Sequence, residues 1–182
     1  MPTIFSHAIF AILTGKAGLT RAVSYWFWFL TAVCAMIPDA DVVSFSLGVN
    51  YRDLFGHRGF THSILFAILF GSFAAFLVHR FLQTGIAFPK LLIFFSLATF
   101  SHPLLDMLTD GGLGVALFAP FSNERFFFPW RPIEVSPIGV RFFSERGLVV
   151  ILSEIIWVWF PAILLFVSFS AIRKFLPAKK GN

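Results

Sequence analysis

The chain alternates between long apolar runs and short polar segments. Apolar runs cover residues 4–13, 22–37 and 63–78, a fourth starts at residue 91, and a fifth covers residues 148–172. A helix needs roughly 20 apolar residues to cross a hydrocarbon core about 30 Å thick, so the later runs approach the length of one crossing. The pattern predicts an all-α polytopic membrane bundle of about four to five spans, with the first run as a short span.

Proline and glycine mark where the predicted helices end. Pro38 closes the second run because proline lacks an amide hydrogen, and the PDAD segment that it opens is expected to form an extended turn. The glycine pair at 111–112 ends the fourth helix. Thr61 is expected to cap the helix that begins at His62 or Ser63.

Residues 111–146 form the extended connection between the last two spans. Four prolines alternate there with aromatic residues, and a tryptophan lies beside an arginine, a combination that suits the headgroup zone of a bilayer. We expect this connection to lie at the membrane interface. Residues 1–182 then form a single integral membrane domain.

Composition excludes an ordinary soluble domain. Of the 182 residues, 58% are hydrophobic, 13% are charged and 27 are phenylalanine, more apolar surface than a small aqueous core could bury. The net charge is +5, but the basic residues form no clustered run, so nucleic acid is not an expected partner. Cys34 is the one cysteine, which leaves neither an intrachain disulfide nor a cysteine-rich metal site.

Charges separate between the two predicted membrane faces. One face carries eight cations and no carboxylate, and an excess of Lys and Arg is typical of cytoplasmic loops. These cations are Lys16, Arg21, Arg80, Lys90, Arg173, Lys174, Lys179 and Lys180. The other face carries the aspartates and all histidines except His79, so the polar motifs are expected on the extracytoplasmic side.

Seven potential metal ligands lie at the predicted helix ends of that face. They are His7, Asp39, Asp41, His57, His62, His102 and Asp106. Imidazole and carboxylate ligands favour zinc, with manganese or iron as alternatives, and the lack of thiolates argues against a structural zinc finger. Seven ligands suit two or more divalent ions. Each residue alone could instead be a solvated or capping group.

Two spacings support shared ligation. His102 and Asp106 are four apart, so they lie on one face of a helix, and Asp110 would extend that face by another turn or belong to a polar turn. Asp39 and Asp41 could face one ion or bridge two, although Asx turns give the same letters.

The string GHRGFTHS, residues 56–63, adds a charged group to the ligands. Arg58 stands beside His57, which indicates anion binding, and Arg125 or Arg131 could also hold a phosphate. Glu154 lies inside an apolar helix, where an ionisable group is costly and is a candidate for function. The catalytic candidates are Asp41, His62, Glu154 and Arg58.

These motifs together resemble the YdjM-type family, described as inner-membrane-associated metal-dependent hydrolases of bacteria. The resemblance rests on SHAIF with its early histidine, PDAD, GHRGFTHS and SHPLLDMLTDGG with the aromatic loop after it, and so covers most of the chain. It implies a multi-pass protein of the bacterial inner membrane that acts as a hydrolase, with the seven residues above as ligands. The C-terminal helix departs from the family pattern, which leaves the role of Glu154 less supported.

We therefore expect a membrane-bound metal-dependent hydrolase that cleaves phosphoester bonds by metal-activated water. The motif-bearing ends lie near headgroup depth, and the ligand set has a remote similarity to zinc-dependent bacterial phospholipase C. Both favour a membrane lipid or a lipid-linked phosphate as substrate. Protein partners cannot be read from the sequence. The alternative is a non-enzymatic protein that binds a divalent metal for transport or for structure.

Overall fold

The computed structural model describes residues 1–19, 21–137 and 139–175. Lys179 and Lys180, two of the eight cations assigned to one face, lie outside the described residues. The described residues form six helices of ten or more residues: α1 (Ile4–Gly18), α2 (Tyr25–Met36), α4 (Ile64–Phe81), α5 (Phe88–Asp106), α6 (Glu145–Glu154) and α7 (Phe160–Phe175). Shorter turns are η1 (Ile37–Val42), α3 (Val43–Ser46), η2 (Phe60–His62), η3 (Gly139–Phe142) and the π-helical turn η4 (Ile155–Trp159).

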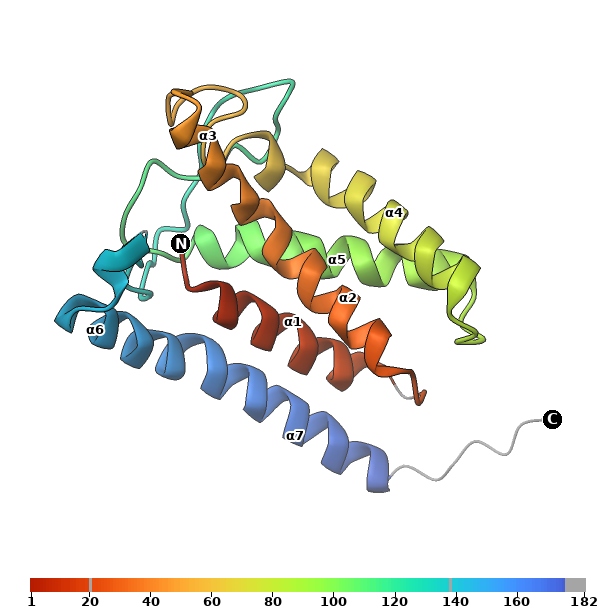
Figure 1. Cartoon of the computed structure of the whole chain (residues 1–182). Helices are drawn as coiled ribbons and strands as arrows, with labels where there is room; N and C mark the ends of the chain where they lie inside the picture. Colours follow the sequence, from red (N-terminus) through yellow and green to blue (C-terminus); the bar gives the residue numbers. More distant parts are fainter. Residues whose placement is uncertain (20, 138, 176–182) are drawn as a thin grey trace.

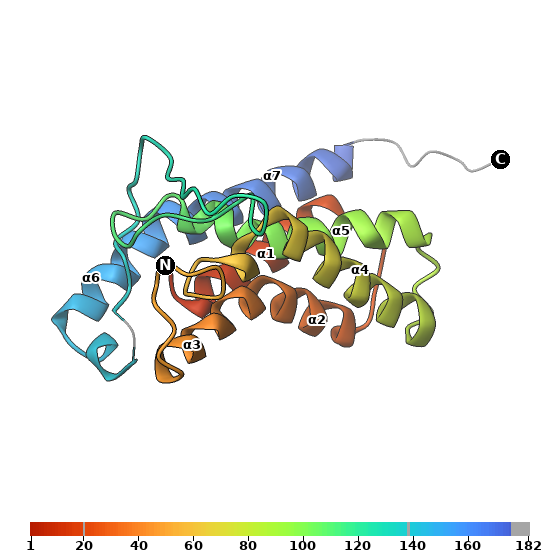
Figure 2. The ribbon, with the colours of Figure 1, turned by 90° about the horizontal axis from the view of Figure 1, so that it is seen from above.

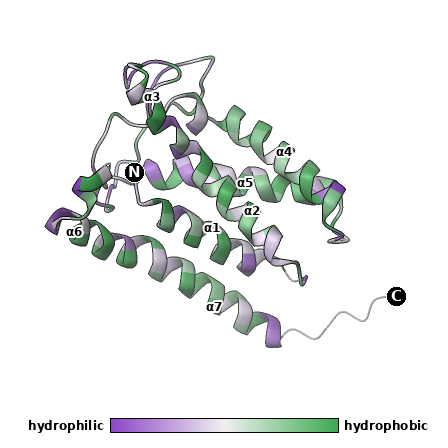
Figure 3. Cartoon of the chain, viewed as in Figure 1, coloured by the Kyte–Doolittle hydropathy of each residue, from purple (hydrophilic) through white to green (hydrophobic). Residues whose placement is uncertain are grey.

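The expected all-helical membrane bundle is confirmed. Four helical stretches are long and apolar enough to cross a membrane: Tyr25–Ser46, Ile64–Phe81, Phe88–Asp106 and Glu145–Phe175. The apolar helix α1 has 15 residues and is shorter than these. Hydrophobic residues cover the long helices along most of their length, while polar residues gather at their ends (Figure 3).

The helices pack around α5 and α1. α5 lies against α4 and α2, and α1 packs against α2, α5 and α7. Phe27, Phe95 and Leu91 form the fully buried centre of the apolar core. Gly71 of α4 allows close packing on α5, because a Cβ there would lie 2.4 Å from the backbone nitrogen of Ser96.

The two ends of the bundle differ in structure. The N-terminus, the α3 turn, the long connection and the start of α6 gather at one end, and the α4–α5 turn lies at the other (Figures 1 and 2). At that second end, the guanidinium of Arg173 donates to backbone carbonyls of Lys16, Ala17 and Leu19. The bundle thus brings the polar motifs together at one end, as the charge pattern predicts.

Three expectations about the helix ends were wrong: PDAD is not extended, Thr61 is not the cap of α4, and α5 ends at Asp106 instead of at the glycine pair 111–112. Pro38 does not stop the chain in an extended turn, because α2 passes directly into the 3₁₀ turn η1, where Pro38 occupies an early position that needs no amide donor. Asp39 and Asp41 are therefore helical. The cap of α4 is Ser63, whose hydroxyl accepts from the Phe66 amide, and not Thr61.

The 111–146 connection has more local structure than expected. One isolated β-bridge pairs Thr109, just before the connection, with Ile133, another pairs Val115 with Phe126, and the connection includes η3. Its last residues belong to α6, which begins at Glu145. Its place at the membrane interface and the single-domain organisation remain predictions.

Candidate metal centre

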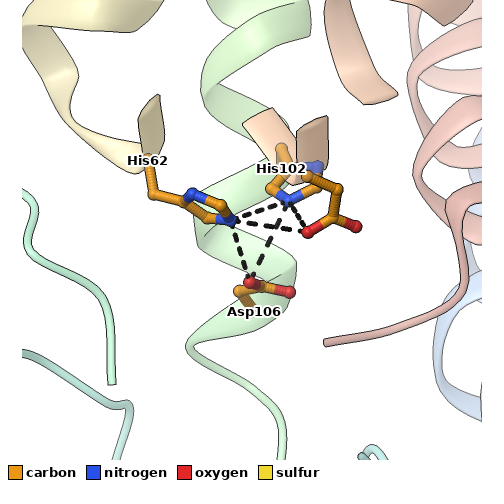
Figure 4. A group of neighbouring side chains, drawn as sticks. His62, His102 and Asp106 are labelled. Carbon is orange, nitrogen blue, oxygen red and sulfur yellow. Dashed lines mark hydrogen bonds and ion pairs between the residues drawn. The ribbon is translucent and has the colours of Figure 1, made fainter. Parts of the chain in front are cut away.

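Four buried side chains converge where η1, η2 and α5 meet. Asp39, His62, His102 and Asp106 each offer one ligand atom, and these atoms lie within 4.8 Å of one another. His62 Nε2 is 3.1 Å from His102 Nε2 and 3.3 Å from Asp106 Oδ2 (Figure 4). Asp39 Oδ1 lies 3.3 Å from His102 Nε2 and 3.7 Å from His62 Nε2. The four residues form one compact cluster, here called the four-residue centre.

Hydrogen bonds fix both imidazoles so that Nε2 faces this cluster. His102 Nδ1 is 2.7 Å from the carbonyl of Ala35, which can only accept, so Nδ1 carries the proton. His62 Nδ1 faces Thr61 Oγ1 at 3.0 Å and Asp41 Oδ2 at 3.1 Å. A ligating histidine usually donates its other ring nitrogen to such a partner, which fixes its tautomer.

The carboxylates of the centre differ in their partners. Both oxygens of Asp39 are buried without a hydrogen-bond donor among the described residues, whereas Asp106 Oδ2 pairs with Arg58 Nε at 2.9 Å. Buried carboxylates are costly unless they are paired or coordinate a metal. Asp39 could therefore take part in holding a cation.

The geometry of the four ligand atoms fits a metal ion. Tetrahedral zinc bonds of about 2.0–2.1 Å place ligand atoms about 3.3 Å apart, and the distances given above scatter around this value. Two imidazoles and two carboxylates are ligands that zinc, manganese and iron accept. The buried His and Asp residues could therefore hold a metal ion.

The environment of His62 also favours a cation. Burial lowers the pKa of His62, but the nearby carboxylates of Asp106, Asp39 and Asp41 outweigh it and raise that pKa well above the ordinary value. The carboxylates that hold a proton on this imidazole would equally attract a metal ion, which would replace the proton.

A second group of ligands shares Asp39. Asp39, Asp41 and His57 also offer atoms within 4.8 Å of one another. Asp41 is well satisfied: Oδ1 lies 2.6 Å from His57 Nδ1, and Oδ2 accepts from the Arg58 amide at 3.0 Å and from the Thr61 hydroxyl at 2.7 Å. Asp41 thus orients both His57 and His62, besides being a possible ligand itself.

Arg58 reaches the centre from an unusual backbone position. Its φ is 60°, in the left-handed region. Gly56 lies two residues before it and Gly59 directly after it, at positions with no room for a side chain. A Cβ on Gly56 would lie 2.1 Å from the Asn50 carbonyl, and one on Gly59 would lie 2.3 Å from the Leu54 carbonyl. The two glycines permit the close backbone approach that the motif predicts, and this loop places Arg58 beside the ligands.

The donors of Arg58 are directed at protein groups. Nε lies 2.9 Å from Asp106 Oδ2, Nη1 donates to the Gly111 carbonyl and Nη2 donates to Thr109. Arg58 is 1% exposed. In this structure Arg58 therefore pairs with Asp106 and with groups of the loop that follows α5.

His7 lies at the edge of the centre. It is fully buried, stacks on His102 with ring centroids 3.7 Å apart, and its Nε2 is 3.6 Å from Asp106 Oδ1. Neither of its ring nitrogens has a hydrogen-bond partner among the described residues. His7 could therefore be a further metal ligand, next to Asp106 Oδ1.

Glu154 is buried but stands apart from the ligands. It accepts from the Thr3 amide, from the Thr3 hydroxyl at 2.6 Å and from the Ser6 hydroxyl at 2.5 Å. Trp159 Nε1 donates to Ser6 Oγ at 2.7 Å. The structure places Glu154 at the N-terminus of α1, the helix that carries His7, one turn away from that histidine.

The sequence reasoning missed several supporting residues. Thr61 links Asp41 to His62, Thr109 supports Arg58, and Thr3 and Ser6 bind Glu154. The position of Thr61 directly before a ligand histidine was the available signal for the first of these. Long-range partners such as Thr3 gave none.

Three other polar candidates lie outside the cluster. Arg125 donates to the carbonyls of His57 and Tyr51, and Arg131 stacks on a phenylalanine ring. Asp110 does not extend the helical face of Asp106, because α5 ends first and Asp110 accepts from the Val135 amide instead.

A helical membrane bundle with a buried His/Asp centre at one end is the class of protein that the fold and the site define. The sequence model of the YdjM inner membrane protein family matches residues 1–176, and the chain belongs to this family. It is also 40% identical over 166 residues to the inner membrane protein YbcI of Escherichia coli (strain K12), covering 91% of this chain and 95% of that protein. No solved structure matches. The family confirms the resemblance that the motifs indicate and an inner-membrane location.

Proposed function

We propose that the protein is a metal-dependent hydrolase of phosphoester bonds in membrane lipids or lipid-linked phosphates. The observation that carries the proposal is the convergence of four ligand atoms within 4.8 Å of one another, including an Asp39 carboxylate without a hydrogen-bond donor among the described residues. Zinc is the ion expected from this ligand set, and the shared Asp39 allows a second ion between the two groups. The centre is expected on the extracytoplasmic side.

The residues support such a reaction in defined ways. A bound divalent ion supplies Lewis-acid chemistry, lowering the pKa of water and neutralising an anionic oxygen. Asp41 and the Ala35 carbonyl hold His62 and His102 in the required tautomers, and Arg58 pairs with Asp106. In the reaction, the water oxygen bonds to phosphorus, the bond from phosphorus to the alcohol oxygen breaks, and the alcohol takes a proton from the water.

The test combines metal analysis with turnover. Detergent-purified wild type should contain stoichiometric metal and release phosphate or a phosphorylated headgroup from one member of a panel of phospholipids and prenyl phosphates. His57→Ala should lose turnover while remaining folded. A wild-type protein without stoichiometric metal, prepared without chelator, contradicts the proposal.

A second candidate is a structural metal, because the ligands come from separate segments that an ion would hold together. Chelation separates the two functions. If removal of the metal unfolds the protein and no lipid is turned over, the ion is a structural staple.

A further inference from the structure

Two apolar cavities lie next to each other beside the metal centre, and Asp39 lines both. One, of about 300 Å³, is lined by residues that include Ile4, Phe5, Val42 and Phe142. The other, of about 340 Å³, is lined by Val33, Met36 and Ile37 among others. Ile4 and Asp39 line both. We call the two together the α1–α2 groove, because they lie along the first turn of α1 and the end of α2.

The groove is apolar along its length but ends on a ligand of the centre. Asp39 is 5% exposed, and both its oxygens are buried without a hydrogen-bond donor among the described residues. The Oδ1 atom lies 3.3 Å from His102 Nε2, inside the four-residue centre. A molecule in the groove would thus have its polar end beside Asp39, at the edge of the centre, and its apolar part against Ile4 and Val33.

The depth of the groove follows from the length of α1. The 15 residues of this helix rise about 22 Å, less than the hydrocarbon thickness of about 30 Å. Lys16 lies in the last turn of α1, where Arg173 also binds the backbone, and these cations mark the membrane surface at that end. Ile4, at the opposite end of α1, therefore lies within the hydrocarbon on the other side, below the headgroups.

We propose that the α1–α2 groove holds the hydrocarbon chain of a phosphate-bearing lipid, which enters laterally from the bilayer and places its phosphate beside Asp39, at the edge of the four-residue centre. This inference rests on the proposed function and specifies its substrate as a lipid that remains in the membrane. Ile4 and Phe5 are 40% and 60% exposed, so the groove is open toward the bilayer. Water would gain few hydrogen bonds along apolar walls. A partner helix, about 10 Å in diameter, is too wide for a cavity of this volume.

The experiment uses photocrosslinking of the whole protein in vesicles. The probe is phosphatidic acid with a diazirine in one acyl chain, present at low abundance in phosphatidylcholine. Labelled peptides are identified by mass spectrometry. We compare wild type with Ile4→Trp and Val33→Trp, which fill the groove from opposite walls. Ile93→Trp is the control because Ile93 is 60% exposed on α5, away from the groove.

We expect labelling to concentrate on the segments around Ile4 and Val33 and to fall about tenfold in each groove variant, with bound metal unchanged. The control should label like the wild type. Excess glycerol phosphate should not compete, because it lacks the chain. Labelling spread evenly over the lipid-facing helices, or unchanged by both groove variants, overturns the proposal.

The outcomes also separate this inference from the proposed function. Concentrated labelling without hydrolysis of any lipid would keep the groove and reject the hydrolase. Hydrolysis of a membrane lipid at the wild-type rate by both groove variants would keep the hydrolase and reject the groove. Competition by glycerol phosphate would mean that the centre binds free phosphoesters instead of lipids.

Discussion

Asp106 and Glu154 are both fully buried carboxylates near the same end of the bundle, yet their surroundings differ. Glu154 receives hydrogen bonds from an amide and two hydroxyls of the α1 terminus. Asp106 pairs with Arg58 and lies against His62. The comparison separates two uses of an intramembrane acid: Glu154 joins two helices through hydrogen bonds, while Asp106 belongs to a cluster of charged residues that could hold a metal ion.

The largest expected effect is on the centre itself. His102→Ala removes one of four ligand atoms, so we expect metal affinity to fall by more than about 100-fold, beyond what loss of an outer-shell partner causes. Elemental analysis and calorimetric titration of detergent-purified protein measure this. His79→Ala, at the opposite end of α4, is the matched control. Unchanged metal content in His102→Ala would contradict a metal centre at Asp106 and so would leave no difference in role between Asp106 and Glu154.

Glu154→Ala tests the other side of the comparison. It leaves the Thr3 amide and two hydroxyls without their acceptor, and unsatisfied buried groups cost about 1–3 kcal/mol. We expect a lower unfolding temperature in detergent, with the folded fraction still binding metal at the wild-type stoichiometry. Glu154→Gln keeps one acceptor oxygen, so its unfolding temperature should lie between those of the wild type and Glu154→Ala. Loss of metal from fully folded Glu154→Ala would show that Glu154 serves the centre directly.

Asp41→Asn tests whether Asp41 is a direct metal ligand or only orients the ligand histidines. The amide keeps an oxygen for the Thr61 hydroxyl but loses the charge that orients His57 and His62, so metal affinity should fall by about tenfold. Asp110→Asn retains its acceptor for the Val135 amide and is the control. A loss as large as that of His102→Ala would identify Asp41 as a direct ligand.

The smallest effect is expected at the opposite end of the bundle. Arg173→Ala removes donors to carbonyls at the end of α1, and because the contact is partly exposed we expect a loss of at most about 1 kcal/mol. Denaturant titration measures it, and metal affinity should not change. A change in affinity would mean that the position of α1 at this end controls His7.

The sequence predicts much of the fold and the composition of the cluster. The apolar runs locate the helices because bilayer thickness sets their length, and the spacing of His102 and Asp106 places both on one helical face. The alternating direction of the spans is enough to bring distant motifs to one end. Both predictions depend on local patterns.

The missed features depend on tertiary contacts. Whether Pro38 stops a helix or starts a 3₁₀ turn is decided by what packs around it, so PDAD was misread as an extended turn. The partners of Arg58 and Glu154 are brought together by folding and carry no spacing signal. The sequence therefore identifies the charged residues but does not show which groups each of them contacts.

The link between Thr3 and Glu154 joins positions 151 residues apart. During synthesis α1 therefore enters the bilayer long before its carboxylate partner has been made. Until α6 arrives, the first turn of α1 has no acceptor from that helix. A truncated or stalled chain would therefore lack the contact that ties the start of α1 to the last hydrophobic segment.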